Sequence, residues 1–330
     1  MTAASQPALI GLDWGTSSLR GYVLAADGSV LAAIAKPWGI QHLPAGGFAA
    51  ALAGIAGEWR SREPALPVVA AGMVGSRQGW REVPYVECPA DAGAIARGLV
   101  PFEVESGLIH FVPGVIQRGP LPNVMRGEET QIVGAMAREP ALATESLIVL
   151  PGTHSKWVTI RDGRILRFDT YMTGEIFAVL RDHSLLGKPA REAGPEAADA
   201  EVKQAAFHRG LAVAGESGAE GVGGRLFTTR SLYLTGALHP AATLDYLSGL
   251  LIGEEIRSTI AADRGGPLPP IVLIGDEALG ARYRVALEAF GIGGACVFGD
   301  SAAAGLWRIA RTAGLVSATT SIHSASAAHG

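Results

Sequence analysis

The chain is poor in cysteine: it has only two, Cys88 and Cys296, which lie far apart in the sequence. This excludes a disulfide framework and a cysteine-rich zinc site. Because each cysteine lies in an apolar stretch, we expect both to be reduced residues of the core. Charged residues are also few, at 18% against 48% apolar residues, so the 330-residue chain should fold compactly rather than remain disordered.

Excess basic charge and long apolar runs are missing as well. The formal net charge of −4 disfavours nucleic acid or an anionic membrane as a partner, although a local basic pocket can still bind a small anion. No apolar run approaches the roughly 20 residues that a membrane helix needs. The first residues show neither the basic nor the apolar segment of a secretory signal, so we expect a cytoplasmic protein.

Two familiar nucleotide-binding motifs are absent from the sequence. It contains no GxxxxGK[ST] loop, and no GxGxxG follows its first expected strand. These absences argue against P-loop kinases and against NAD-dependent enzymes.

What the sequence does contain is one pattern used twice, in residues 12–30 and 150–165. Each copy has an apolar strand ending in Gly-Thr, a small hydroxyl residue, a basic residue, a second strand, an Asp-Gly turn and a third strand. A strand that ends this way and doubles back presents backbone N–H groups and hydroxyls to phosphate oxygens. The repeat predicts a duplicated fold that binds one nucleotide between its halves, as in an ATP-dependent phosphotransferase.

The first loop combines a carboxylate with small hydroxyl residues. Asp13 stands at the end of the first strand, where it could bind the Mg²⁺ of MgATP or, alternatively, cap the following turn. With a second loop present, we favour the metal role. Gly15, Thr16 and Ser17 are expected to bind phosphate oxygens, and Arg20 is either a cationic clamp on the phosphates or an exposed surface charge.

The second loop has no carboxylate at the corresponding position, which suggests that it binds phosphate but no metal. Gly152, Thr153 and Ser155 are its expected phosphate-binding residues. Lys156 either contacts phosphate or points outward, as strand alternation would allow. His154 either orients the substrate or is a core histidine that hydrogen-bonds to the backbone.

Acidic residues at two expected helix starts are candidates for the general base. Glu128 and Glu129 open one helix, and Glu175 opens another. Acidic residues are common in a first helical turn because of the helix dipole. A carboxylate there can also accept the proton of an attacking hydroxyl during phosphoryl transfer. We favour Glu129 as the base, with Glu128 as its capping partner and Glu175 as the rival.

Periodicity predicts alternating strands and helices in both halves. Strands are expected at 8–13, 19–25, 29–35, 67–74, 108–113, 146–150, 156–161, 164–169, 270–274 and 295–298. Helices are expected at 48–59, 90–100, 172–186, 196–210, 244–262, 278–290 and 300–310, with one more starting near Glu128. The strand–glycine–helix segment around Gly275 suits adenosine. We expect an N-terminal lobe over 1–140, a C-terminal lobe over 141–316, and a disordered tail over 317–330.

Seven motifs in a fixed order resemble one enzyme family. They are IGLDWGTSSLR, AGMVGSRQGW, NVMRGEETQIVGA, LPGTHSKWV, YMTGE, HSLLG and LSGLLIGEE. Together they resemble the 2-dehydro-3-deoxygalactonokinase family of the actin/hexokinase/Hsp70 superfamily. The resemblance implies an α/β fold of two ribonuclease-H-like lobes with an interdomain active-site cleft. It also implies ATP-dependent phosphorylation of 2-dehydro-3-deoxy-D-galactonate to its 6-phosphate, with Mg²⁺, in galactonate catabolism.

The resemblance further indicates what the substrate pocket must contain. A sugar acid carries a carboxylate, whose recognition calls for an arginine, and Arg77 and Arg126 are the candidates. Trp80 could form a wall of the pocket. The GEE segment is also similar to the exopolyphosphatase branch of the superfamily, where the second carboxylate activates water, and this similarity points to Glu129 as the base.

Two other functions stay open at this stage. The Glu128–Glu129 pair also suits a phosphohydrolase of the exopolyphosphatase type, which would release phosphate from ATP without a sugar acid. An actin-like or chaperone-like protein would instead use ATP as a conformational switch. The expected partner is a small sugar acid and neither nucleic acid nor a membrane, and the sequence leaves homo-oligomerisation open.

Overall fold

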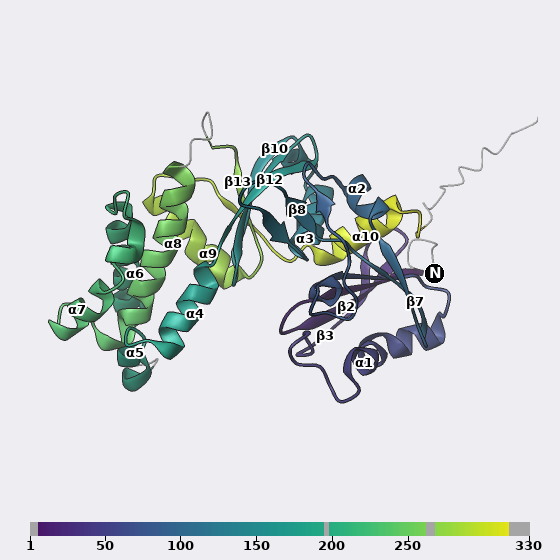
Figure 1. Cartoon of the computed structure of the whole chain (residues 1–330), viewed down its shortest axis with the longest axis horizontal. Helices are drawn as coiled ribbons and strands as arrows, with labels where there is room; N and C mark the ends of the chain where they lie inside the picture. Colours follow the sequence, from purple (N-terminus) through teal and green to yellow (C-terminus); the bar gives the residue numbers. More distant parts are fainter. Residues whose placement is uncertain (1–5, 195–197, 262–267, 317–330) are drawn as a thin grey trace, which may run out of the picture. The chain divides into compact units, whose positions relative to one another are not determined.

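The computed structural model describes residues 6–194, 198–261 and 268–316, which form two compact units (Figure 1). Of these described residues, unit 1 comprises 6–144, 161–167 and 301–316, and unit 2 comprises 145–160, 168–194, 198–261 and 268–300. The tail expected at 317–330 lies outside the described residues. None of the helices formed by the described residues combines the length and apolar character needed to cross a lipid bilayer.

Unit 1 is built on a six-stranded sheet in the order β3-β2-β1-β4-β7-β6. The first three strands are antiparallel neighbours, and β4 and then β7 add in parallel to β1. The left-handed Gly28, at φ 89°, closes the tight turn between β2 and β3, as the Asp-Gly pair predicts. The strands are β1 (Pro7–Trp14), β2 (Leu19–Ala25), β3 (Val30–Lys36), β4 (Val68–Gly72), β6 (Val100–Val104) and β7 (Gly107–Phe111).

Helices and a small second sheet complete unit 1. Helix α1 packs Leu52 and Ile55 into the core beneath β1. The three-stranded sheet β5-β8-β9 was not predicted from the sequence, because its strands are only two or three residues long. The helices are α1 (Gly47–Arg62), α2 (Ala92–Arg97), α3 (Glu128–Arg138) and α10 (Ala302–Thr312). The strands of the small sheet are β5 (Val86–Glu87), β8 (Val115–Gln117) and β9 (Asn123–Met125).

The last helix, α10, packs against α3 in unit 1, although the sequence analysis assigned it to the second lobe (Figure 1). Two glycines make the close approach possible. A Cβ on Gly134 would overlap the carbonyl oxygen of Ser301, and a Cβ on Gly305 would overlap that of Thr130. The hairpin end 161–167 also groups with unit 1, because Ile165 and Ala90 exchange backbone hydrogen bonds.

Unit 2 repeats the sheet plan with five strands in the order β12-β11-β10-β13-β14. Here too the hairpin partners come first, and β13 and β14 add in parallel. The repeated order confirms the expected duplicated α/β fold. The strands are β10 (Glu145–Leu150), β11 (Ser155–Arg161), β12 (Arg164–Tyr171), β13 (Ile271–Ile274) and β14 (Cys296–Phe298).

The helices of unit 2 cover this sheet and extend beyond it. The long α6 and α8 lie side by side (Figure 1), and Phe207 and Ile256 from them enter the main core with Trp157. The helices are α4 (Thr173–His183), α5 (Lys188–Ala193), α6 (Ala200–Gly215), α7 (Thr228–Leu234), α8 (Thr243–Ala261) and α9 (Glu277–Ala289).

Both cysteines are free, as expected, but only one is even half-buried. Burial raises the pKa of the Cys88 thiol to about 11, so this thiol stays protonated and unreactive. Cys296 is exposed, and the prediction of a core position is wrong for it. It opens β14, a short strand at the edge of the sheet.

Candidate active site

The first glycine–threonine loop follows β1 and carries an ion pair at its base. Asp13 and Arg20 lie opposite each other in the β1–β2 ladder, and Arg20 Nη2 donates to Asp13 Oδ2 at 2.6 Å. Asp13 is 9% exposed. Thr16 and Ser17 are exposed and therefore accessible to a ligand. Arg20 thus compensates the charge of Asp13, a contact that neither alternative in the sequence analysis anticipated.

The backbone of a neighbouring segment fixes this loop. Gly15 N–H donates to Ser18 O at 2.9 Å, and Ile40 N–H donates to Gly15 O at 3.1 Å. Gly39 lies so close to Thr16 that a Cβ would overlap the Thr16 carbonyl. The loop is therefore held in shape, with its hydroxyls facing solvent.

The glycine-spaced segment 72–80 carries two of the predicted substrate-binding residues, one exposed and one packed against the core. Arg77 is exposed at the tip of the segment. Trp80 stacks on Phe48 with ring centroids 5.6 Å apart and meets Trp14 edge-on at 6.2 Å. Trp80 is thus part of an aromatic core cluster, which favours a structural role over that of a pocket wall.

Arg126 is buried, with an exposed fraction of only 8%. Its Nη2 donates to Val83 O at 2.7 Å, and its guanidinium lies 4.4 Å from the centre of the Tyr85 ring. Nε and Nη1 have no hydrogen-bond partner, and no carboxylate pairs with Arg126 among the residues that the structure describes. A buried cation without an acidic partner is unusual, because desolvation of the charge is left uncompensated.

The paired glutamates at the start of α3 both bind backbone N–H groups. Glu128 Oε2 accepts from Arg126 N–H at 2.9 Å, and Glu129 Oε2 accepts from Gly127 N–H at 2.7 Å. Thr130 Oγ1 also donates to Glu129 Oε1 at 2.9 Å. Glu129 is fully buried, whereas Glu128 is half-buried. Capping is therefore shared by both residues, and only Glu128 faces solvent.

Burial sets the protonation state of Glu129. Desolvation, with a further contribution from the adjacent Glu128 charge, raises the pKa of Glu129 from an ordinary 4.5 to about 8. At neutral pH the Glu129 carboxyl is therefore mostly protonated and cannot accept a proton from a substrate.

The second glycine–threonine loop joins β10 to β11. Thr153 and His154 are exposed, whereas Ser155 and Lys156 are buried beneath the loop. Lys156 Nζ donates to the His154 carbonyl at 3.2 Å, and Ser155 Oγ lies 2.9 Å from Tyr283 Oη. The contacts of Ser155 and Lys156 thus support the loop from within the protein, and Gly152 and Thr153 remain for a ligand.

The N-terminus of α4 braces the same loop. Glu175 N–H donates to Thr153 O at 3.0 Å, and a Cβ on Gly174 would overlap the Gly152 carbonyl. The Glu175 carboxylate pairs with His154 Nε2, and both side chains are close to half exposed. Glu175 and His154 therefore form one polar pair beside the loop.

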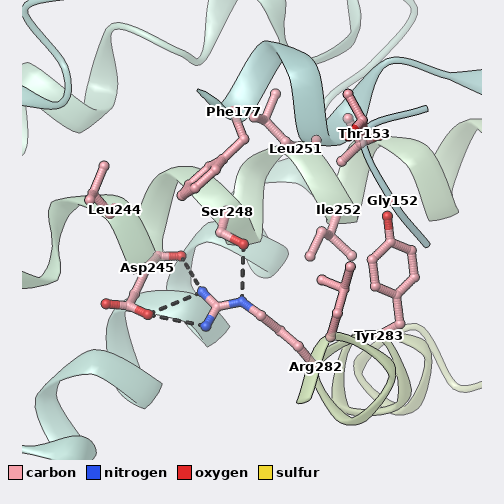
Figure 2. A pocket seen from close by; sticks show the side chains of 13 residues that line it. Gly152, Thr153, Phe177, Leu244, Asp245, Ser248, Leu251, Ile252, Arg282 and Tyr283 are labelled. Atoms are coloured by element: carbon pink, nitrogen blue, oxygen red, sulfur yellow. Dashed lines mark hydrogen bonds and ion pairs between the residues drawn. The ribbon is translucent and has the colours of Figure 1, made fainter. Parts of the chain in front are cut away.

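A cavity of about 460 Å³ adjoins the loop within unit 2 (Figure 2). Gly152 and Thr153 form one part of its lining, and apolar side chains such as Phe177 and Ile252 form another. This size and mixed lining are typical of a small-molecule site.

A charged cluster forms a further wall of the cavity. Arg282 Nη1 donates to Asp245 Oδ1 at 3.1 Å and Arg282 Nε donates to Ser248 Oγ at 3.0 Å (Figure 2). One face of the guanidinium lies 4.0 Å from the centre of the Phe207 ring. These contacts fix the guanidinium rigidly in the wall.

Gly152 and Thr153 of the cavity lining were predicted as site residues, whereas most of the other lining residues were not. Gly275, expected to serve adenosine, is not among the lining residues. It lies next to the loop, where a Cβ would stand 3.8 Å from Pro151 O, and the following Asp276 caps α9. Arg282 lies in the strand–glycine–helix segment around Gly275 that we expected to suit adenosine, but nothing in the local sequence indicated a role for Arg282 itself.

No group of three or more acidic, histidine or cysteine side chains that could hold a metal ion occurs in the described part of the chain. At a nucleotide site Mg²⁺ does not need a cluster of protein ligands. It is commonly bound by one or two carboxylates together with phosphate oxygens and water. Asp13, at the end of a strand beside exposed hydroxyls, fits such a single-carboxylate site.

Comparison with known proteins gives one consistent family. The model of the 2-keto-3-deoxy-galactonokinase family matches residues 13–309. A probable 2-dehydro-3-deoxygalactonokinase of Rhizobium meliloti (strain 1021) is 38% identical over 94% of this chain and 98% of its own length. The 2-dehydro-3-deoxygalactonokinase of Escherichia coli (strain K12) is 37% identical over 89% of this chain and 94% of its own.

A solved structure agrees with this result. A crystal structure of a Sinorhizobium meliloti protein, provisionally named 2-dehydro-3-deoxygalactonokinase, aligns with a TM-score of 0.80 at 35% identity. The alignment covers 92% of this chain and 98% of that one. The similarity therefore extends through both units.

Proposed function

The chain belongs to the 2-keto-3-deoxy-galactonokinase family, and on that premise we propose that it transfers the γ-phosphoryl group of ATP to 2-dehydro-3-deoxy-D-galactonate. The acceptor is the terminal hydroxyl, and the products are ADP and the 6-phosphate. The observation that carries this proposal is the family match over residues 13–309, which spans both glycine–threonine loops and the α3 glutamates. The comparisons support neither the phosphohydrolase nor the ATP-switch alternative.

The cavity of unit 2 supports the proposed binding of ATP. Its lining begins at Gly152 and Thr153, whose turn suits phosphate oxygens, and continues to the apolar and Arg282 walls, which suit a nucleoside. We assign the phosphates to this loop and to Gly15, Thr16 and Ser17, and the adenosine to the cavity. Gly275 would act by shaping the backbone next to the loop.

We assign Asp13 to Mg²⁺, directly or through a water molecule. When bound, this ion would neutralise charge on the phosphates during transfer. Arg20 holds the Asp13 carboxylate at 2.6 Å and so fixes its direction. The same guanidinium adds positive charge beside the loop, which favours the approach of phosphate.

Arg126 is our assignment for the carboxylate of the sugar acid. It is a buried guanidinium with two unpartnered N–H groups, and a carboxylate from the substrate would supply the missing acceptors. Gly75 packs against the Arg126 guanidinium: a Cβ on Gly75 would stand 3.1 Å from Nη1. Because Gly75 covers this nitrogen, we expect the segment 72–80 to shift when the substrate binds. Exposed Arg77 and the His154–Glu175 pair are secondary candidates for contacts with substrate hydroxyls.

We assign the proton-accepting role to Glu128, in place of the Glu129 that the sequence analysis favoured. The half-buried Glu128 faces solvent, whereas Glu129 is enclosed, hydrogen-bonded and mostly protonated at neutral pH. In phosphoryl transfer such a base orients the hydroxyl and takes its proton, and most of the rate comes from positioning and charge neutralisation.

A coupled ADP-release assay tests the proposal. Purified protein with MgATP should turn over 2-dehydro-3-deoxy-D-galactonate, and ATP alone should give at most about 1% of that rate, since a positioned acceptor contributes about a hundredfold or more. Fast phosphate release from ATP without acceptor would contradict the kinase and favour a phosphohydrolase. The gluconate-derived epimer in the same assay would show the stereochemical preference.

The variant D13N tests the metal assignment within the same assay. Turnover should fall at least about a hundredfold, because the amide cannot replace a charged ligand of Mg²⁺. D182N is the matched control: Asp182 is exposed and pairs with the neighbouring Arg181 at the surface, so loss of its charge should leave turnover unchanged. Equal turnover in D13N and wild type would remove Asp13 from the metal site.

A further inference from the structure

Helix α8 carries a buried carboxylate that the proposed reaction does not use. Glu255, in the LSGLLIGEE motif, is 1% exposed and lies in the middle of the helix. Burial raises its pKa, while hydrogen bonds from its neighbours oppose that rise. A buried carboxylate of this kind persists only where several donors satisfy it.

Three donors from three different elements converge on Glu255. Trp157 Nε1 of β11 donates to Oε1 at 2.7 Å, and Tyr283 Oη of α9 donates to Oε2 at 2.8 Å. Thr173 Oγ1, at the first residue of α4, donates to Oε2 as well. One side chain of α8 therefore ties together a strand and two helices.

Two of these donors, Tyr283 and Thr173, connect Glu255 to the second glycine–threonine loop. Burial raises the pKa of the Tyr283 phenol well above its usual range, so the phenol keeps its proton and donates it to Glu255. The phenol oxygen must then accept from Ser155 Oγ, 2.9 Å away. Ser155 Oγ in turn lies 3.4 Å from Gly152 N–H. The hydrogen bonds thus run in one direction, from the loop backbone to the carboxylate.

The other route passes through α4. The residue after Thr173, Gly174, lies so close to Gly152 that a Cβ on it would overlap the Gly152 carbonyl. Glu175 N–H then donates to Thr153 O at 3.0 Å. By holding Thr173, Glu255 fixes the start of the helix that braces the loop. Thr173 also lines the cavity beside that loop. Tyr283 lines the same cavity (Figure 2).

We propose that Glu255 is a positioning residue that, through Tyr283 and Ser155, holds the Gly152–Thr153 loop in the shape that binds nucleotide phosphates. It touches no substrate itself. The inference rests on the proposed function for the identity of the loop's ligand. Its sequence signal is the second acidic residue of the GEE in LSGLLIGEE, since the first, Glu254, pairs with the partly buried Arg257 of the same helix.

The variant Y283F tests the link, because it keeps the ring and removes the hydroxyl between Glu255 and Ser155. The matched control is W157F, which removes another donor to the same carboxylate without breaking the connection to the loop. S155A is a second variant that breaks the connection and keeps the hydrogen bonds that Trp157, Tyr283 and Thr173 donate to Glu255. For each, the dissociation constant of ADP is measured by calorimetry at 25 °C, and the KM values of ATP and sugar acid are measured in the kinase assay.

We expect Y283F and S155A to weaken ADP about tenfold, the usual effect of one lost hydrogen bond, and to raise the KM of ATP similarly. The KM of the sugar acid should not change. W157F should lower the melting temperature but keep ADP affinity within twofold. A loss below threefold in Y283F and S155A, or an equal loss in W157F, overturns the inference. Absent kinase activity in a wild type that binds ADP would contradict the proposed function alone.

Discussion

Replacing Glu129 by glutamine should stabilise this protein, and the gain should grow as the pH rises. Glu129 is fully buried, and its two oxygens accept from Gly127 N–H and Thr130 Oγ1. A glutamine keeps the shape, accepts the Gly127 N–H with its oxygen and donates its amide to the threonine oxygen. The variant therefore resembles the protonated carboxyl, which is the form that burial favours.

The sign follows from the two pKa values. Glu129 has a pKa of about 8 in the folded protein and an ordinary 4.5 in the unfolded chain. Below pH 4.5 both states carry the proton and the pH dependence vanishes. Between 4.5 and 8 only the folded protein keeps the proton, so the free energy of unfolding falls as the pH rises. Above about 8 both states are ionised, and the full loss has been reached.

The magnitude comes from the width of this interval. Each pH unit within it changes the free energy of unfolding by about 1.36 kcal/mol, which sets an upper limit of about 5 kcal/mol for the whole range. Relaxation around the charged form should reduce this, so we expect E129Q to exceed wild type by about 2–4 kcal/mol at pH 9. At pH 5 the two should agree within about 1 kcal/mol.

Urea unfolding at pH 5, 7 and 9, followed by circular dichroism, measures the difference. The control is E139Q, because Glu139 is exposed at the far end of α3 and should show no pH-dependent gain. A constant difference between E129Q and wild type, or one that grows toward acid pH, would refute the buried protonated carboxyl. The kinase assay adds a second reading: E129Q should keep turnover within about threefold if Glu129 is not the base.

Three further outcomes follow from the same geometry. E128Q should lower turnover at least about a hundredfold in the kinase assay at unchanged melting temperature, as expected when a positioned base is lost. R126Q should raise the KM of the sugar acid about 10- to 100-fold and leave that of ATP unchanged, because the contact with the substrate carboxylate is lost and Arg126 is not assigned to the nucleotide. G305A should cost about 1–3 kcal/mol in urea unfolding because its Cβ would overlap the Thr130 carbonyl, whereas G57A, a helical glycine with open space around it, should be neutral or stabilising.

The hairpins of both units were predictable because their signals are local. Alternating apolar residues and an Asp-Gly turn define each one, and the structure has Gly28 at φ 89° and Gly163 at φ 70° in those turns. Short strands such as β5 and β9 were not predictable, since two or three residues are too few for a period. The position of α10 depends on small residues in two distant segments, Gly134 and Gly305, and no local pattern reports such a contact.

The candidate site was predictable where a loop defines it and not where packing does. Gly-Thr turns marked Thr16 and Thr153 correctly as exposed loop residues. The burial of Ser155 depends on Tyr283, which lies far along the chain. The same holds for the Asp245–Arg282 pair, whose members come from different helices. Which of Glu128 and Glu129 is buried depends on which side of α3 faces the core, and two adjacent acidic residues in the sequence do not decide this.

The two glycine–threonine loops are alike in sequence, but carboxylates serve them in different ways. In unit 1, Asp13 lies at the loop itself, close to the surface and paired with Arg20, where it can also meet a cation. In unit 2 the loop has no carboxylate of its own, and Glu255 lies beneath it, reached through Ser155 and Tyr283. A buried carboxyl group can fix the loop's shape through hydrogen bonds from protein donors and needs no acidic residue among the loop residues themselves. The missing acidic residue in the second loop is therefore consistent with the proposed roles, in which both loops bind phosphate and Mg²⁺ is assigned to Asp13 of the first loop alone.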